Sequence, residues 1–218
     1  MKINSIRIDS TNSMTDLCML GIKYPTDKSP YNQEQGLHKH AYTAIYDLLF
    51  SHRRYDDLIL GEIGILDNNS MLSWREYFPN AVLHGFEYSQ ERLSKALNDN
   101  LPNTYYHFMD VLHKDSIRNG LSIFTGFDII IEDSTHVFED QIRVANEAVK
   151  FLKTGGFLVI EDIFINADES KYEQELECIS EYFSSATFIF ADHDLKHSPN
   201  WNNDKLLVLV RNDKPYFH

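Results

Sequence analysis

Acidic side chains and one histidine follow two apolar stretches of the chain, residues 127–131 and 157–160. In chain order these side chains are Glu132, Asp133, His136, Glu161 and Asp162. Carboxylates bind hard cations, and both carboxylates and imidazoles can accept protons during a reaction. If the two stretches end at the same place in the fold, the five side chains form a candidate site for such chemistry.

The segment that carries these residues has the pattern of a strand–helix–strand unit. β-Branched side chains in residues 127–131 favour a strand, and apolar residues at spacings of three and four between 142 and 152 favour a helix. Residues 154–156, Thr-Gly-Gly, are expected to end that helix before a second strand at 157–160. Such units are right-handed and parallel in nearly all cases, so both strands end at one edge of the sheet, where open α/β sheets bind ligands.

Taken one at a time, the same residues have simpler interpretations. Asp133 and His136 could belong to the first turn of a helix, and Glu161 with Asp162 could be a solvated strand end. Four such residues at two neighbouring strand ends favour a functional site over these alternatives.

Strands and helices alternate along the rest of the chain. Apolar runs predict further strands at residues 58–63, 81–87, 104–108, 187–190 and 205–210. Helical spacing predicts helices at residues 38–50, 71–77, 89–98 and 170–183. Ser70 and Ser89 are the expected N-cap residues of the second and third of these helices. This order predicts an α/β protein with a doubly wound, mostly parallel seven-stranded sheet and helices on both faces.

We expect a single compact unit. Residues 58–218 would form the Rossmann-like domain, and residues 1–57 would form an N-terminal helical cap packed on its core. The chain has 218 residues, an ordinary apolar fraction of 43% and a formal net charge of −13. Such a charge argues against nucleic acid and anionic membranes as partners.

The rest of the composition favours a cytoplasmic protein. No stretch approaches the roughly 20 apolar residues of a membrane span. The first ten residues lack the apolar core of a signal peptide. Cys18 and Cys178 form neither a metal-binding pattern nor a disulfide framework.

A nucleotide-like ligand is indicated at the end of the first predicted core strand, which closes with Glu62-Ile63-Gly64. The next strand ends in Glu87, whose carboxylate could accept hydrogen bonds from two ribose hydroxyls, although an acid at this place can also serve solubility alone. Gly64 would let the backbone pass close to a ligand.

The sequence disfavours a dinucleotide as that ligand. The G-x-G-x-x-G fingerprint is missing because Leu66 and Asp67 stand where later glycines are needed. S-Adenosylmethionine carries no phosphate and does not depend on that fingerprint. Asp110, after the third strand, could bind its adenine amino group.

Four stretches of sequence resemble a known family: LGEIGI, WREYFPNAVLHGFE, FDIIIEDSTH and LKTGGFLVIEDI. Their order resembles the class I S-adenosylmethionine-dependent methyltransferases. More narrowly, it is similar to the metal-dependent sugar O-methyltransferases of macrolide biosynthesis and the related cephalosporin-pathway methyltransferase. Their pattern has DDGSH after the fourth strand and IED after the fifth. The stretch TDKSPYNQEQGLHKHAYTAIYDLLF also looks like the segment before the first strand of that family, so the likeness covers roughly residues 21–163.

The resemblance implies a fold, a reaction and roles for individual residues. The fold is the Rossmann-like methyltransferase fold with an antiparallel last strand, and the reaction is an O-methylation that uses S-adenosylmethionine and Mg²⁺ or another divalent cation. The implied metal ligands are Asp133, Glu161 and Asp162, and the implied catalytic residues are Asp133 and His136, the latter as base. The residues expected to contact the cofactor are Tyr42, Glu62, Gly64, Glu87, Tyr88 and Asp110.

The chain departs from the family pattern in two regions. Glu132 replaces the first Asp of DDGSH and Ser134 replaces its Gly, and neither change should remove a ligand. Leu66 and Asn68 replace glycines of the first loop. Because Asn and Asp tolerate left-handed backbone conformations, residues 67–69 could make the same turn.

The implied metal suits the implied reaction. A sugar hydroxyl is a very weak acid and a poor match for an unaided histidine, whereas a bound divalent ion lowers the pKa of a coordinated oxygen and fixes its position. Three carboxylates suit Mg²⁺, and neighbouring strands about 4.8 Å apart can bring them together. Consecutive strand side chains point to opposite faces, so Glu161 and Asp162 reach one ion only if the strand ends there. Asp162 is the safer ligand of the two.

Other polar residues leave alternatives open. A rival metal cluster is conceivable at His193, Asp194 and His197, for which contact with substrate is the preferred interpretation. Aromatic and imidazole side chains of the first helix could close over the ligands or simply pack: His38, His40, Tyr42 and Tyr46.

Three functions are compatible with the sequence. The first is the metal-dependent O-methyltransferase acting on a small-molecule or sugar-containing substrate. The second is a non-catalytic cofactor-binding or structural protein of the same fold, and the third is a metal-dependent hydrolase. The acceptor would be contacted by residues 25–40 and 192–204, and self-association into a homo-oligomer is conceivable.

Overall fold

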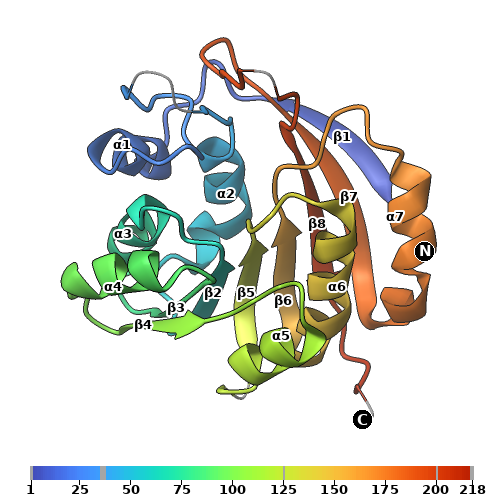
Figure 1. The fold of residues 1–218 in the computed structure, drawn as a ribbon. Helices are drawn as coiled ribbons and strands as arrows, with labels where there is room; N and C mark the ends of the chain where they lie inside the picture. The colour runs from blue at the N-terminus through green and yellow to red at the C-terminus, as the bar shows by residue number, and fades with distance from the viewer. Residues whose placement is uncertain (1, 35–37, 125, 200, 217–218) are drawn as a thin grey trace.

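A sheet in the order β1-β7-β8-β6-β5-β2-β3-β4 runs through the molecule (Figure 1). The computed structural model describes residues 2–34, 38–124, 126–199 and 201–216. The strands are β1 (Asn4–Asp9), β2 (Ile59–Ile63), β3 (Val82–Glu87), β4 (Thr104–Phe108), β5 (Phe127–Glu132), β6 (Leu152–Ile160), β7 (Phe183–Asp192) and β8 (Lys205–Arg211). Neighbouring strands are parallel, except that β8 is antiparallel to both β6 and β7.

The predicted α/β class and the antiparallel last strand are confirmed, but the sheet has eight strands instead of seven. The additional strand is β1, which lies within the expected helical cap and pairs with β7 at the edge of the sheet. Its residues, NSIRID, are mostly exposed. An edge strand that buries so little carries no apolar run, and for this reason the sequence pattern did not reveal it.

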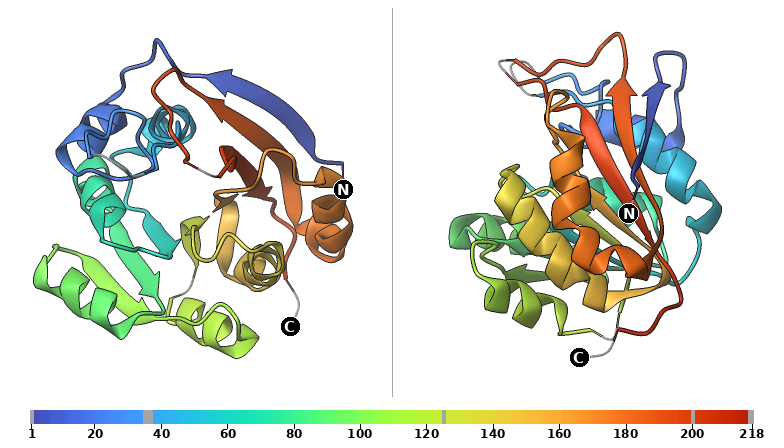
Figure 2. Two further views of the ribbon diagram at one scale, coloured as in Figure 1. Left: turned by 45° about the horizontal axis from the view of Figure 1, so that its top comes forward. Right: turned by 90° about the vertical axis from the view of Figure 1, so that its right-hand side faces the viewer.

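Helices cover both faces of the sheet and enclose two separate apolar cores. One core contains side chains of α1 (Asp16–Lys23), α2 (Thr43–Phe50), α3 (Asn69–Tyr77) and α4 (Gln90–Asn98). The other contains side chains of α5 (Lys114–Leu121), α6 (Phe138–Ala148) and α7 (Glu169–Glu175). Figure 2 shows α6 and α7 on one face and α2 on the other. Among the described residues, no helix combines the length and apolar character that a membrane crossing requires.

The ends of several elements differ from the sequence prediction. The N-cap of α3 is Asn68, not Ser70, because the left-handed backbone of Asn68 starts the helix two residues earlier. Ser89 does cap α4, since its hydroxyl accepts a hydrogen bond from the amide of Arg92. α6 ends at Ala148 and a 3-10 turn, Val149–Phe151, follows.

Residues 154–156 therefore do not end a helix but lie inside β6. The predicted helix 170–183 is divided into α7 and a 3-10 helix, Glu177–Tyr182. A third 3-10 helix, Ser51–Arg53, follows α2.

The order of the strands reverses between β2 and β5. From β2 the chain adds β3 and β4 on one side, while β5 and β6 lie on the other, and the carboxyl ends of these parallel strands meet at one edge. Open α/β sheets bind ligands at such a reversal. Gly64 follows β2 at this point with φ +90°, and a Cβ there would lie 2.1 Å from the carbonyl oxygen of Asp133. Glycine is thus required for the ends of β2 and β5 to approach this closely.

Candidate active site

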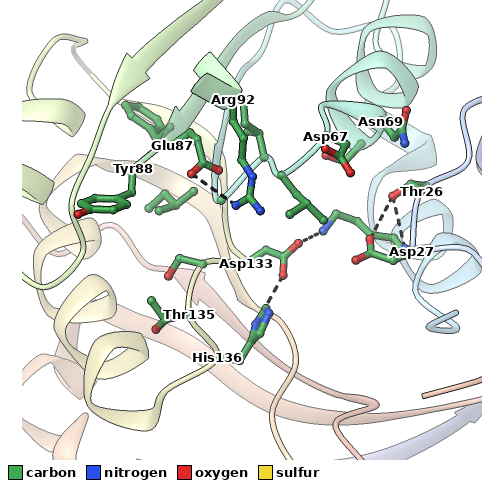
Figure 3. Close-up of a pocket in the computed structure, with 18 of the residues that line it drawn as sticks. Thr26, Asp27, Asp67, Asn69, Glu87, Tyr88, Arg92, Asp133, Thr135 and His136 are labelled. Atoms are coloured by element: carbon green, nitrogen blue, oxygen red, sulfur yellow. Dashed lines mark hydrogen bonds and ion pairs between the residues drawn. The ribbon is translucent and has the colours of Figure 1, made fainter. Parts of the chain in front are cut away.

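A cavity of about 580 Å³ opens at the carboxyl ends of β2, β3, β4 and β5 (Figure 3). Six of the residues predicted from the sequence line it: Gly64, Glu87, Tyr88, Asp110, Asp133 and His136. Glu87 is 7% exposed and accepts a hydrogen bond of 2.8 Å from the amide of Ser89. Figure 3 shows Glu87 beside Arg92, whose guanidinium lies 3.9 Å away. The carboxylate of Glu87 is therefore fixed and faces a space large enough for a nucleoside.

Two residues predicted to contact the cofactor lie behind the cavity wall. Glu62 is fully buried and accepts a hydrogen bond of 2.7 Å from the indole nitrogen of Trp74. Tyr42 is also fully buried, and its hydroxyl donates to Asp162 at 2.8 Å. Neither residue is among those that line the cavity. From behind the cavity wall, Glu62 and Tyr42 both orient other side chains of the site.

The glycine-poor first loop reaches the required turn with ordinary residues. Leu66 has φ +45° and Asn68 has φ +68°. The amide side chain of Asn68 donates to Asp99 at 2.7 Å, and that of Asn69 donates to the carbonyl of Pro25 at 2.9 Å. The left-handed backbone of Asn68 agrees with the prediction for residues 67–69, whereas the positive φ of Leu66 was not predicted.

Asp133, His136 and Asp162 come together at the edge of the cavity. One ligand atom from each lies within 4.8 Å of the others. The His136 ring lies between the carboxylates, with Nδ1 3.7 Å from Asp133 and Nε2 3.6 Å from Asp162. Burial lowers the pKa of His136, so its imidazole is neutral near pH 7. The strand ends thus bring together three of the predicted site residues, and Glu161 is not part of this group.

Backbone strain accompanies this cluster. His136 has φ +57° and Asp162 has φ +58°. Left-handed conformations cost about 1–2 kcal/mol for residues with a side chain and are concentrated at functional sites. The turn at Asp162 also ends the alternation of β6, so that Asp162 reaches His136 while the neighbouring Glu161 reaches Lys28.

Lys28 is the central residue of the site that the sequence pattern did not reveal. Its side chain is 3% exposed, and its ammonium contacts Asp133, Glu161 at 2.7 Å and Glu62 at 3.3 Å. Burial opposes its charge, but the three carboxylates outweigh burial and raise the pKa of Lys28 well above its usual value. Only its place in the TDK stretch of the family-like N-terminal segment could have drawn attention to it.

Glu161 and Asp162 belong to different hydrogen-bond networks. Glu161 is held by Lys28 and by the hydroxyl of Tyr46. Asp162 is approached by His40 at 3.5 Å, and His40 is in turn 2.9 Å from Asp204. Burial opposes the charge of His40, but the two aspartates raise its pKa to about 9, so it is an imidazolium. Asp162 therefore has a cation on one side and a neutral imidazole on the other.

The donor set fits a divalent cation. Two carboxylates and one imidazole converge, and the buried Nδ1 of His136 has no hydrogen-bond partner. Burial raises the pKa of Asp133, and the nearby Glu161 and Asp162 raise it further against the opposing effect of Lys28. Such a surplus of buried negative charge favours a bound cation. Asp133 and Asp162 would hold it, Glu161 would stay with Lys28, and the imidazole of His136 beside the two carboxylates would keep a lone pair to accept a proton.

The remaining sequence candidates do not share one location. In the described part of the chain, His193, Asp194 and His197 do not form a metal-binding group. His193 instead contacts the hydroxyl of Tyr31 at 3.0 Å, and His197 pairs with the backbone of Lys39. His38 lines the cavity, whereas His40 and Tyr46 are buried.

The fold is the Rossmann-like fold that solved methyltransferases also have. The MycE methyltransferase from the mycinamycin biosynthetic pathway, solved in complex with Mg and SAH, superimposes with a TM-score of 0.68 at 18% identity over 94% of this chain and 57% of that chain. A second MycE structure, with Mg, SAH and mycinamycin VI, gives a TM-score of 0.67 with the same identity and coverage. No protein-family model matches the chain.

Sequence comparison finds similar sugar O-methyltransferases. The chain is 26% identical over 162 residues to 8-demethyl-8-(2-methoxy-alpha-L-rhamnosyl)-tetracenomycin-C 3'-O-methyltransferase of Streptomyces olivaceus. It is 23% identical over 131 residues to 8-demethyl-8-alpha-L-rhamnosyl tetracenomycin-C 2'-O-methyltransferase of the same organism. These matches cover 71% and 57% of this chain but only 38% and 33% of the relatives.

Proposed function

We propose that the chain transfers a methyl group from S-adenosylmethionine to a hydroxyl of a sugar or related polar metabolite with the help of a divalent cation. The observation that carries this proposal is the convergence of Asp133, His136 and Asp162 beside the cavity that Glu87 faces. A methyl donor and a base for the acceptor hydroxyl would thereby lie side by side.

Each residue has a defined task in this reaction. Glu87 binds the ribose hydroxyls of the methyl donor, and Asp110 and Tyr88 contact its adenine. The oxygen of the acceptor forms a bond to the methyl carbon while the carbon–sulfur bond breaks, and its electron pair stays on sulfur. His136, neutral near pH 7, takes the hydroxyl proton and releases it to water. The cation, when bound, makes the hydroxyl more acidic.

The comparisons favour a sugar as the acceptor. Both Streptomyces relatives are named for transfer to the 2'- or 3'-oxygen of a rhamnosyl group. MycE has been solved with mycinamycin VI in addition to Mg and SAH. If the chain were a metal-dependent hydrolase, the cavity in front of Glu87 would have no methyl donor to bind.

The metal mechanism can be tested with Asp133→Asn. We expect methyl transfer to fall about 10²–10⁴-fold because the cation and the base both depend on this carboxylate. S-Adenosylmethionine affinity, measured by isothermal titration calorimetry, should stay close to that of the wild type. A chelator should reduce wild-type turnover in the same assay.

Asp128→Asn is the matched control. Asp128 is a largely buried acid at the other end of β5, paired with Arg53 and Lys153, and does not line the cavity. Its loss should leave turnover near the wild-type value. Full activity of Asp133→Asn in the presence of chelator would show that the metal mechanism is wrong, and a wild type that binds no S-adenosylmethionine would contradict the whole proposal.

A further inference from the structure

Two exposed aromatic rings lie outside the cavity, and one of them is next to His136. Trp201 is 43% exposed and Phe164 is 38% exposed. Their rings are stacked, with centroids 5.7 Å apart and planes inclined by 20°. The Trp201 ring also meets the His136 ring edge to face at 6.3 Å. His136 lines the cavity whereas Trp201 and Phe164 do not, so the aromatic pair borders the cavity at His136.

The loops that carry the pair are tied to each other and to the N-terminal segment. The amide of Ile165 donates to the carbonyl of Asn202 at 2.7 Å, which joins the residues after β6 to those before β8. The backbones of Lys39 and His197 exchange hydrogen bonds of 2.7 and 2.9 Å. The aromatic pair is thus held in position by backbone bonds on both sides.

The chemistry of this surface matches one kind of ligand. Flat aromatic rings present a broad apolar face to a ligand without losing much conformational freedom, and exposed apolar surface on loops commonly marks a binding site. The pyranose ring of a glycoside has an apolar face of C–H groups and an edge of hydroxyls. Lying on the pair, such a ring would turn a hydroxyl toward His136.

We propose that Trp201 and Phe164 form the acceptor platform, the surface on which the sugar ring of a glycoside lies while one of its hydroxyls reaches His136. This inference rests on the proposed function and names the substrate class and the residues that select it. The methyl donor occupies the cavity, and the acceptor on the platform extends one hydroxyl past His136 to the methyl group. Specificity for an apolar-faced sugar then comes from the stacked pair.

The platform can be tested by binding alone, without methyl donor or metal. The chain has two tryptophans, and Trp74 is buried behind the site, so Trp201 dominates any fluorescence response to an added ligand. We expect phenyl α-L-rhamnopyranoside and methyl α-L-rhamnopyranoside to cause a saturable change in wild-type fluorescence, and phenol alone to cause none. A response to phenol equal to that of the glycosides would overturn the assignment to a sugar ring.

Ligand-observed saturation-transfer NMR extends the test to variants without Trp201. Trp201→Ala should weaken phenyl rhamnoside binding about tenfold, as expected for the loss of one good stacking contact. Phe164→Ala should weaken it less, and Trp201→Phe, which keeps a flat ring, should restore most of the affinity. Leu195→Ala removes another exposed apolar side chain from the same loop and should have no effect.

The outcomes separate this inference from the proposed function. Wild-type affinity in Trp201→Ala, or no glycoside binding by a wild type that binds S-adenosylmethionine, would show that the platform is wrong and leave the methyltransferase proposal intact. Glycoside binding that depends on Trp201 in a protein that fails to bind S-adenosylmethionine would support the platform and contradict the methyltransferase proposal.

Discussion

At the scale of single residues, the site is organised by a buried ammonium. Lys28 contacts Glu62 near the end of β2, Asp133 after β5 and Glu161 after β6, and so ties together the ends of three adjacent strands. One oxygen of Asp133 is engaged by Lys28, which leaves the other to face His136. Lys28 therefore fixes the direction in which Asp133 can offer an oxygen to a cation.

Replacing Lys28 by methionine should expose this dependence. Methionine keeps the length of the side chain but leaves three buried carboxylates without their partner, and breaking a buried ion pair costs about 3–5 kcal/mol. We expect a large fall in the free energy of unfolding, measured by urea denaturation, together with altered Mn²⁺ affinity measured by electron paramagnetic resonance.

Lys23→Met provides the comparison. Lys23 pairs with Glu76 on the surface, with its side chain 54% exposed, and solvent screens such pairs strongly. This variant should unfold at the same urea concentration as the wild type. Equal stability of the two variants would mean that the ammonium of Lys28 does not hold the strand ends together.

At the scale of elements, the close approach of β2 and β5 depends on Gly64. A Cβ at this position would meet the carbonyl oxygen of Asp133 at 2.1 Å, so alanine would push the two strand ends apart. We expect Gly64→Ala to lose S-adenosylmethionine affinity in calorimetry and to be markedly less stable, because its backbone is left-handed in addition to being crowded.

Gly155→Ala separates these two causes. Gly155 also has a positive φ, of +75°, but a Cβ there would meet nothing within 4 Å. This variant should lose about 1–2 kcal/mol from backbone strain alone and keep its cofactor affinity. If Gly64→Ala behaves like Gly155→Ala in both measurements, the contact between the strand ends is unimportant for the site.

The same elements show how far sequence reasoning reaches. The buried strands were predictable because β-branched runs with both faces covered leave a continuous apolar signal, as in β5. The strand β1 was not predictable, because its exposed edge requires no apolar residues. α1 and α5 were also missed, because α1 lies in a segment of mixed polar composition and α5 buries only Ile117, Gly120 and Leu121.

The site was predictable to a similar degree. Acids at strand ends were visible, since parallel topology alone brings Asp133 and Asp162 to one edge. The different contacts of Glu161 and Asp162 could not be predicted, because they depend on the left-handed turn at Asp162. Lys28 was invisible because it lies 105 residues before its partner Asp133, in a segment without periodicity.

At the scale of the whole molecule, buried ionisable groups make the stability depend on pH in opposing directions. His84, in β3, is fully buried, and burial together with neighbouring His107 lowers its pKa to about 4. Glu132, at the end of β5, is also fully buried, and burial raises its pKa to about 7. As the pH falls, His84 is protonated more readily in the unfolded chain than in the folded chain. As the pH rises, Glu132 is ionised more readily in the unfolded chain than in the folded chain.

The contribution of His84 can therefore be isolated only as a difference between variants. An unfolded histidine has a pKa of about 6.5, so the neutral ring of His84 gives its full stabilisation above that pH and loses it progressively as the pH falls toward 4, by at most about 1.4 kcal/mol per pH unit. His84→Phe keeps an aromatic ring against Phe124, 3.9 Å away between centroids, and removes the titration. Its free energy of unfolding, measured by urea denaturation between pH 4 and 7.5, should improve relative to the wild type as the pH falls below 6.5.

Phe86→Leu alters the packing beside His84 without removing a titratable group, so its difference from the wild type should be constant over the same range. A constant difference for His84→Phe as well would mean that His84 is protonated equally in the folded and unfolded chain, and the acid sensitivity of the fold would then have another origin.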